Sequence, residues 1–362
     1  MVSTVAAARL RHARRKRQRP SKHRLVELYD ITVIGGGPSG LFALFYAGMR
    51  GAKAKVIDAL PELGGQLYAL YPEKYIYDMP GIPAITGQAL VDQCVEQAFQ
   101  WPHAKCMEER VIDVARQPDG TIKIVTDKAE HLSKTVILAN GIGAFKPRKL
   151  AAPTAGAFEG KGLQYYARSF DEYAGKRVVV VGGGDSAVDY ALAITPKAAS
   201  LAVVHRSPFR AHPHTVEQLR ASSATLYQPD YEVKEVHGNA ELSAVTIHQT
   251  KSKEEIRIEC DTILCALGFV SDLGEVKKWG IELDGNGIKV DTATQETSVK
   301  GIYAAGDVVQ HAGKLKLIAC GTSEAAIAVN QAMNFMDPSQ KIQPVHSSNL
   351  TLPISAKVGA QP

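Results

Sequence analysis

The sequence has no apolar run that approaches the roughly 18 residues needed to span a bilayer. It contains only five cysteines, and none of them has the C-x-x-C spacing of a redox dithiol or a zinc-ligand pair. An odd number of cysteines without such a framework argues against a disulfide-stapled secreted protein and favours a reducing compartment. We therefore expect a cytoplasmic protein with no membrane partner and no metal site.

Acidic residues are absent from the first 24 positions, which hold nine of the 42 Lys and Arg residues. The remainder carries 33 basic against 37 acidic residues, so the formal net charge of +5 reflects the tail and not the body. We interpret residues 1–26 as a basic disordered extension and expect no nucleic-acid partner, because a basic run alone is not specific. Adhesion of the tail to nucleic acid or to a membrane surface, and an Arg-rich transit peptide, remain alternatives, so the role of the tail stays open.

A glycine-rich turn follows the first apolar strand. The stretch Ile31–Gly40 reads ITVIGGGPSG, which is G-x-G-x-x-G between a short buried strand and a helix. In this pattern Gly35 permits a tight turn, Gly37 lets a pyrophosphate approach the backbone, and Gly40 lets helix and strand pack closely. The helix start, with Pro38 and Ser39, offers free N–H groups to phosphates. Asp58 ends the next strand, at the position where an acid accepts hydrogen bonds from the ribose hydroxyls of an adenosine cofactor such as FAD.

The same pattern recurs later in the chain. Residues 177–187 read RVVVVGGGDSA, and Gly182 and Gly184 open a turn that runs through Asp185 and Ser186 to Ala187. At the offset that leads from Gly37 to Asp58, this second unit has His205 and Arg206, with Arg210 following. A guanidinium matches a 2′-phosphate in charge and geometry, so we expect NADPH to be preferred over NADH, by a margin that the sequence leaves open.

The overall pattern predicts an α/β protein with two Rossmann-like, three-layer ββα nucleotide-binding domains, the NADP domain being inserted into the FAD domain. The Ala-, Pro- and Gly-rich stretch from Pro147 to Gly162 has the composition of a linker. We assign residues 27–146 and 268–345 to the FAD domain, 147–267 to the NADP domain, and 346–362 to a C-terminal arm.

Several longer strings indicate a family. The two glycine turns, a closing Ala304-Ala305-Gly306-Asp307, and the strings at residues 64–67, 69–78, 143–150 and 345–348 resemble the bacterial ferredoxin–NADP⁺ reductases built on the thioredoxin reductase fold. The resemblance covers about residues 28–352. It implies a homodimer in which a tyrosine like Tyr71 stacks on one flavin face and a histidine like His346, from the arm of the other subunit, covers the second face. These two are the candidate catalytic residues. The further FAD contacts that it implies are Gln66, Val111, Phe145, Asp307 and Ser348.

The chain departs from this family pattern in two places. Thioredoxin reductases carry C-x-x-C just before the second glycine turn, whereas residues 165–173 hold no cysteine. A dithiol relay needs two neighbouring sulfurs, so we do not expect direct reduction of thioredoxin. The family also usually has a second arginine after the His-Arg pair, where this chain has Ser207. The NADPH preference should therefore be weaker than is typical, or rest on other residues.

The function predicted from the resemblance is an FAD-dependent oxidoreductase that transfers electrons between NADPH and ferredoxin or flavodoxin. Electrons would pass by hydride transfer to the flavin and then in single steps. The interdomain hinge would lie near Lys146–Lys149 and Gly268, and Lys146, Arg148 and Lys149 could dock an acidic partner. Two alternatives remain: an NAD(P)H-dependent reductase of quinones or small acceptors, and a flavin-binding redox sensor without turnover. The sequence leaves the physiological acceptor and the direction of electron flow open.

Overall fold

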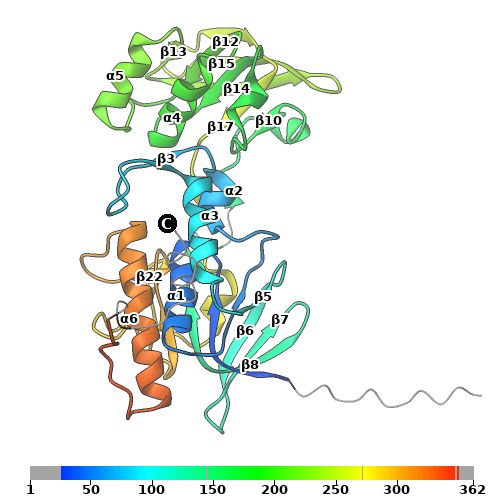
Figure 1. The fold of residues 1–362 in the computed structure, drawn as a ribbon. Coiled ribbons are helices and arrows are strands. Elements are labelled where there is room, and N and C mark those ends of the chain that lie inside the picture. The colour runs from blue at the N-terminus through cyan, green and yellow to red at the C-terminus, as the bar shows by residue number, and fades with distance from the viewer. Residues whose placement is uncertain (1–25, 144–145, 271, 347–348, 350–362) are drawn as a thin grey trace, which may run out of the picture.

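A computed structural model describes residues 26–143, 146–270, 272–346 and 349. The chain forms two α/β domains that lie end to end (Figure 1). The chain crosses between them twice, through β9 (Lys146–Pro147) and β18 (Phe269–Val270), which pair as a short antiparallel ribbon. None of the helices in the described part of the chain is long and apolar enough to cross a membrane.

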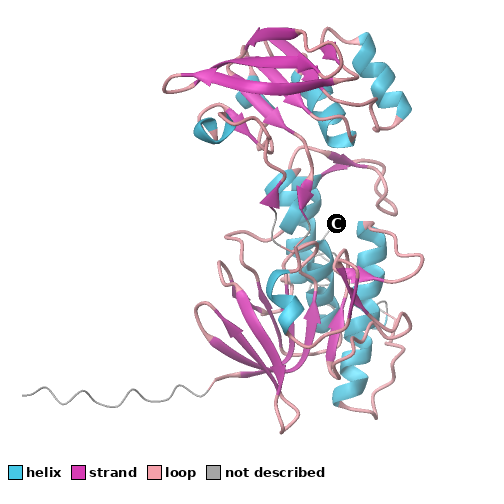
Figure 2. Ribbon diagram, turned by 180° about the vertical axis from the view of Figure 1, so that it is seen from behind, coloured by secondary structure: helices cyan, strands magenta, loops and turns pink. Residues whose placement is uncertain are grey.

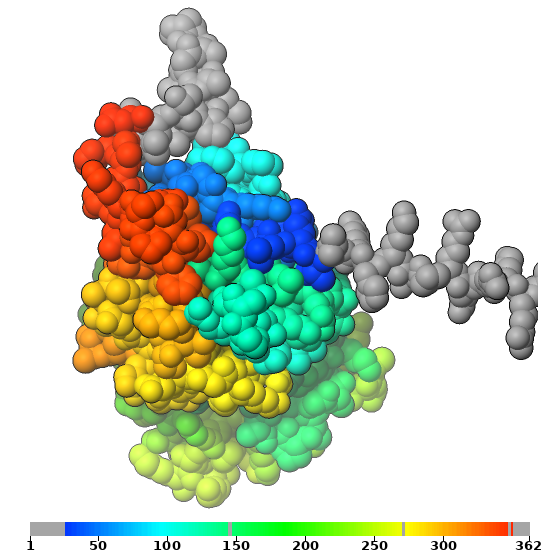
Figure 3. All heavy atoms as spheres, turned by 90° about the horizontal axis from the view of Figure 1, so that it is seen from below, coloured from blue at the N-terminus to red at the C-terminus, as the bar shows by residue number. Residues whose placement is uncertain are grey.

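The first domain combines chain segments from both sides of the insertion. Its parallel strands pair in the order β5-β2-β1-β8, β21 joins β8, and β7 and β6 continue the sheet in antiparallel fashion. Figure 3 shows early and late residues side by side on the lower surface of this domain. The strands are β1 (Leu28–Ile34), β2 (Ala54–Ile57), β5 (Ala104–Cys106), β6 (Val111–Arg116), β7 (Ile122–Thr126), β8 (Glu130–Leu138) and β21 (Ile302–Ala304).

Helices α1 (Pro38–Met49), α3 (Gly87–Ala98) and α6 (Ile318–Met336) pack on one face of this sheet (Figure 2). Side chains of β6, β7 and η3 (Gly274–Lys278) close the other face, so apolar strand residues such as Val33 and Leu138 are fully buried. The central strands have continuous apolar sequences because a central parallel strand is covered on both faces of the sheet. The smaller elements are α2 (Gly65–Leu70), β3 (Tyr75–Ile76), β4 (Ile85–Thr86), β19 (Leu283–Asp284), β20 (Gly287–Lys289) and β22 (Val309–Gln310).

The second domain has three layers. A parallel sheet of order β10-β17-β11-β12-β13 lies between two helices and an antiparallel sheet of order β14-β15-β16. Its elements are η1 (Ala155–Phe158), β10 (Leu163–Gln164), η2 (Phe170–Tyr173), β11 (Arg177–Val181), α4 (Asp185–Ile194), β12 (Ser200–Val204), α5 (Pro213–Ala221), β13 (Thr225–Tyr227), β14 (Tyr231–Gly238), β15 (Leu242–Gln249), β16 (Glu255–Glu259) and β17 (Thr262–Cys265).

One feature differs from the expectation, and a second has structure that its composition did not indicate. The stretch from Pro147 to Gly162 is not a free linker, because Ala152, Ala155 and Phe158 are buried in the core of the second domain. The Tyr- and Pro-rich segment after Gly65 begins with the short helix α2 and continues into the β3–β4 hairpin. In both places the turn-forming composition concealed apolar side chains that pack against a distant part of the chain. The α/β fold with one domain inserted into the other is as predicted.

Candidate functional site

The first glycine turn lies between β1 and α1. Gly35 has φ +103°, and a Cβ atom on it would lie 2.5 Å from the carbonyl oxygen of Ala139. A Cβ on Gly40 would lie only 1.9 Å from the carbonyl oxygen of Gly35, so α1 and β1 touch at this point. A Cβ on Gly37 would meet only Gly65, at 3.9 Å. The space above Gly37 at the start of α1 is therefore open, as an approaching phosphate requires.

The start of α1 presents unpaired donors to this space. Pro38 is at the first turn of the helix, and the helix N-cap at Gly37 has no side-chain hydrogen bond. The backbone N–H of Leu41 is the first to bond within the helix, to Gly37. The N–H groups of Ser39 and Gly40 therefore point out of the helix start, where the helix dipole favours an anion.

Asp58 closes the first turn. Its Oδ2 accepts a 2.5 Å hydrogen bond from the N–H of Gly36, and its Oδ1 accepts a 2.8 Å bond from Leu60. Asp58 is 8% exposed as a residue, and burial raises the pKa of its carboxyl group against the opposing effect of these hydrogen bonds. The side chain thus ties the end of β2 to the glycine turn, and its remaining lone pairs can accept ribose hydroxyls.

The chain segment after β21 reaches the same place. Ser39 packs against Gly306 and Gly321, where added Cβ atoms would lie 2.7 and 2.3 Å from its Oγ. The Gly306–Asp307 turn and the first part of α6 are therefore brought against the start of α1. Asp307 is half-buried at this junction. Residues 39 and 307 are far apart in sequence, so only the folded sheet brings the two motifs together.

A buried ion pair that the sequence did not reveal supports this junction. Nζ of Lys314 lies 2.5 and 2.7 Å from the two carboxylate oxygens of Glu324, and the Lys314 side chain is 3% exposed. Oε2 of Glu324 also accepts a 2.8 Å hydrogen bond from the N–H of Gly306. The pair thus holds the turn that carries Asp307 against α6.

Two further candidate flavin contacts lie on other elements of the first domain. Gln66 is half-buried on α2, with Nε2 3.4 Å from the position of a Cβ on Gly141, and Val111 is half-buried at the start of β6. Next to Gly141, Oδ1 of Asn140 is buried and has no hydrogen-bond partner. Asn140 is a candidate that the sequence reasoning missed. Phe145 and Ser348 lie outside the described residues.

Tyr71 lies where the two domains meet. It ends α2 and packs against the core of the second domain. His346 is exposed, beyond the end of α6 at Met336, and its carbonyl oxygen accepts a 2.9 Å hydrogen bond from Asn349. The two candidate catalytic residues therefore lie in different places: Tyr71 at the junction of the domains, and His346 in the exposed segment after α6.

The second glycine turn repeats the geometry of the first. A Cβ on Gly182 would lie 2.4 Å from the carbonyl oxygen of Ala266, whereas one on Gly184 would meet nothing within 4 Å. Gly184 is the N-cap of α4, without a side-chain hydrogen bond. Asp185 and Ser186 form the first turn of α4, and Ala187 is buried against the domain core. This helix start is a second open site for phosphate groups.

His205 supports the second turn from beneath. The residue is 8% exposed, and its ring stacks with Phe209 at 6.2 Å between centroids and would lie 2.0 Å from a Cβ on Gly183. Burial, and then the charges of Arg210 and Arg206, lower the pKa of His205. The imidazole is therefore neutral at pH 7, and the positive charge near this turn comes from Arg206 and Arg210. The N–H of Arg210 donates a 2.8 Å hydrogen bond to Gly183.

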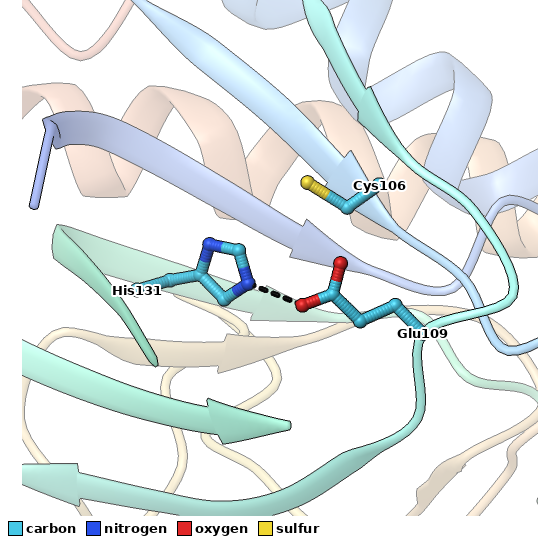
Figure 4. A group of neighbouring side chains, drawn as sticks. All are labelled: Cys106, Glu109 and His131. Atoms are coloured by element: carbon cyan, nitrogen blue, oxygen red, sulfur yellow. Dashed lines mark hydrogen bonds and ion pairs between the residues drawn. The ribbon is translucent and has the colours of Figure 1, made fainter. Parts of the chain in front are cut away.

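A third cluster lies within the first domain. The side chains of Cys106, Glu109 and His131 converge, with their ligand atoms within 4.8 Å of one another (Figure 4). Both imidazole nitrogens are engaged: Nε2 lies 2.6 Å from Glu109, and Nδ1 lies 2.8 Å from Nζ of the buried Lys55. An ammonium ion at this distance would repel a metal cation. We interpret the cluster as a structural Lys–His–Glu network that joins β2 to β8.

Comparison with known proteins identifies the family. Residues 29–332 match the family model described as pyridine nucleotide-disulphide oxidoreductase. The chain is 49% identical over 326 residues to ferredoxin–NADP reductase 2 of Listeria welshimeri, covering 90% of this chain and 98% of the relative. It is 47% identical over 324 residues to ferredoxin–NADP reductase of Geobacillus thermodenitrificans, covering 89% and 97%.

Solved structures agree on the fold. The chain resembles the thioredoxin reductase of T. acidophilum with a TM-score of 0.74 at 24% identity, covering 86% of this chain and 99% of the other. It resembles the thioredoxin reductase of Lactococcus lactis, in its FR conformation, with a TM-score of 0.73 at 25% identity, covering 85% and 98%. The chain therefore belongs to the pyridine nucleotide-disulphide oxidoreductase family and, within it, to the thioredoxin reductase-like ferredoxin–NADP reductases.

Proposed function

We propose that this protein is an FAD-dependent oxidoreductase that transfers electrons between NADPH and ferredoxin or flavodoxin. The observation that carries the proposal is the pair of open glycine turns, each at a helix start and each in its own parallel sheet. The carboxylate of Asp58 is hydrogen-bonded to the first turn, and arginines follow the second. The relatives named ferredoxin–NADP reductase share nearly half of the sequence.

The first site fits FAD. The open space above Gly37, the donors at the start of α1 and the carboxylate of Asp58 match a pyrophosphate next to an adenosine ribose. The unpartnered Oδ1 of Asn140 offers a buried acceptor beside the same turn. Bound FAD supplies the exchange between two-electron and one-electron transfer that the reaction needs. The residues assigned to hold it are Gly35, Gly37, Pro38, Ser39, Gly40, Asp58, Gln66, Tyr71, Val111, Phe145, Asp307 and Ser348.

The second site suits the exchanging nicotinamide nucleotide. The start of α4 would hold the pyrophosphate, and the guanidinium groups of Arg206 and Arg210 would bind the 2′-phosphate. His205 shapes the turn that carries them. The residues assigned to NADP are Gly184, Asp185, Ser186, Ala187, His205, Arg206 and Arg210. We place the domain boundaries at residues 27–146 and 268–345 for FAD and 147–267 for NADP.

Tyr71 is proposed to stack on one face of the flavin. The other face would be covered by His346 of the partner subunit, since His346 is exposed and follows α6 in the segment that leads into residues 346–362. This makes a homodimer the proposed assembly. Sedimentation of the holoprotein tests it, and a monomer at micromolar concentration would contradict it.

The β9–β18 ribbon suits a hinge. Two strands of two residues each carry the whole covalent connection between the domains, and one further backbone bond joins Arg148 to Gly268. Hydride transfer requires the two rings to approach to about 3–3.5 Å. A rotation about this ribbon would bring the second site toward the flavin.

The predicted docking patch of Lys146, Arg148 and Lys149 has less free positive charge than the sequence suggested. Nζ of Lys149 lies 2.5 Å from Oε2 of Glu159 and 4.5 Å from the ring centroid of Tyr165, so part of its charge is already compensated. Arg148 is exposed. If Arg148 guides an acidic partner, the rate of ferredoxin reduction should fall steeply as salt is added. A flat salt profile would contradict docking at this patch.

Two measurements test the proposed function. Anaerobic mixing of the FAD-loaded protein with NADPH should bleach the flavin absorbance, and a failure to do so would contradict an enzyme and favour a redox sensor. Cytochrome c reduction should depend on added ferredoxin or flavodoxin. If quinones are instead reduced with much higher kcat/KM than either protein acceptor, a reductase of small acceptors would replace the proposal.

A further inference from the structure

An acidic side chain lies beside Arg206 of the second site. Oε1 of Glu232 on β14 lies 3.7 Å from Nη1 of Arg206. The Arg206 side chain is 75% exposed and that of Glu232 is 41% exposed, so both can be reached by a nucleotide. The contact depends on tertiary structure, because α5 and β13 separate the two residues in the chain.

Backbone contacts hold this pair beside the glycine turn. The N–H of Asp230 donates a 3.0 Å hydrogen bond to the carbonyl oxygen of Arg206, and the N–H of Tyr231 donates to that of His205 at 3.4 Å. The first residues of β14 thus run alongside the end of β12. The other acid here, Asp230, is already paired with Lys251 at 2.7 Å. Glu232 is therefore the acidic group whose charge acts on Arg206.

The local charge balance is unusual for a 2′-phosphate site. Between residues 205 and 214 the only Lys or Arg side chains are Arg206 and Arg210, since position 207 is serine, and His205 is buried and neutral. A carboxylate repels a phosphate dianion over several ångströms. It is also the group that accepts hydrogen bonds from the free 2′-hydroxyl in NAD-binding sites.

We propose that Glu232 is a specificity-determining residue of the second site. Its carboxylate repels the 2′-phosphate of NADPH and accepts a hydrogen bond from the 2′-hydroxyl of NADH, so the site takes both nucleotides. This rests on the proposed function, which places a nicotinamide nucleotide at this site. The proposal makes the expected preference for NADPH over NADH depend on one carboxylate. Removing that charge should raise this preference, and salt should weaken the effect.

The variant is Glu232→Gln, and the matched control is Glu235→Gln, on the same strand and exposed. Titration calorimetry of the FAD-loaded protein with 2′,5′-ADP and with 5′-AMP measures the phosphate contribution without turnover. We expect E232Q to raise the affinity ratio of 2′,5′-ADP over 5′-AMP about threefold to tenfold. The control should match the wild type. The ratio of kcat/KM for NADPH over NADH, with ferricyanide as acceptor, should rise in parallel.

Two results would overturn the inference alone. One is an equal ratio in E232Q, E235Q and the wild type while both nucleotides bind. The other is a wild-type enzyme that already prefers NADPH by about a hundredfold or more. If neither nucleotide binds and neither NADPH nor NADH bleaches the flavin, the proposed function fails together with the inference. The Arg206→Gln variant separates these cases, because it should weaken 2′,5′-ADP specifically.

Discussion

Nζ of Lys74 in the first domain lies 2.8 Å from Oδ2 of Asp189 on α4 of the second domain. Two further bonds accompany this ion pair. The hydroxyl of Tyr190 donates to the carbonyl oxygen of Leu70 at 3.0 Å, and the N–H of Phe170 donates to Glu73 at 2.9 Å. All three contacts come from the short segment around Tyr71. The segment that carries the proposed flavin-stacking residue is therefore also the latch that holds the domains in this arrangement.

Loosening the latch should speed the first half-reaction. A partly exposed ion pair contributes up to about 1 kcal/mol, so Lys74→Met should increase the rate of flavin bleaching by NADPH by up to about fivefold at low salt. The physical reason is that Tyr71 is packed between the domains, which must separate before a nicotinamide can approach the flavin. Lys123→Met, which removes an ion pair within the first domain, is the control. An unchanged or slower rate in stopped-flow measurements would count against the latch.

Three alanine substitutions should separate the roles of the glycines. Gly40→Ala forces a Cβ against the carbonyl of Gly35 and should destabilise the first domain by about 1–3 kcal/mol. Gly37→Ala meets no close atom, so its melting temperature without cofactor should stay near that of the wild type while its FAD content falls. Gly184→Ala should retain FAD and raise the KM for NADPH. Flavin absorbance per chain and thermal melts check all three. Full FAD content in Gly37→Ala would refute the assigned pyrophosphate position.

Replacing only one partner of the Lys314–Glu324 pair should strongly lower the stability of the protein. Lys314→Met leaves the Glu324 carboxylate buried with only the His311 imidazole, 3.9 Å from its Oε1, as a basic neighbour, and we expect a loss of about 3–5 kcal/mol in the free energy of unfolding. Replacing both residues, as in Lys314→Met with Glu324→Leu, should recover part of this loss, although the bond from Gly306 to Glu324 is then also lost. Urea titrations measure the change. A single variant as stable as the wild type would show that the carboxylate reaches water.

His205 should make the second domain acid-sensitive. Its pKa in the folded protein is lowered by burial and by Arg210 and Arg206, so the unfolded chain binds a proton more readily. The stability contribution is present above the unfolded pKa of about 6.5 and is lost as the pH falls through the lower folded value. The melting temperature should therefore fall between pH 7 and pH 5, and His205→Gln should flatten this slope. Parallel slopes in the two proteins would contradict the assignment.

The family and the two nucleotide-binding motifs could be predicted from the sequence because their signals are local. A glycine turn needs only the strand before it, the helix after it, and an acid or arginine at the end of the next strand. The order Gly35, Gly37, Gly40 and its copy at Gly182 and Gly184 carries this information within a few residues. The fold class follows, since each such unit requires a parallel sheet.

Tertiary structure decided how charges are paired. The sequence suggested that His205 and Arg206 act together, but the fold buries His205 beneath Gly183 and sets Glu232 next to Arg206. It likewise pairs Lys74 with Asp189 across the domain boundary and buries Lys314 against Glu324. Such pairs join strands and helices that are distant in the chain, and neither partner has a local pattern. The sequence alone therefore determined the two dinucleotide-binding motifs, whose signals are local, and the packing of its elements determined which charged side chains lie beside them.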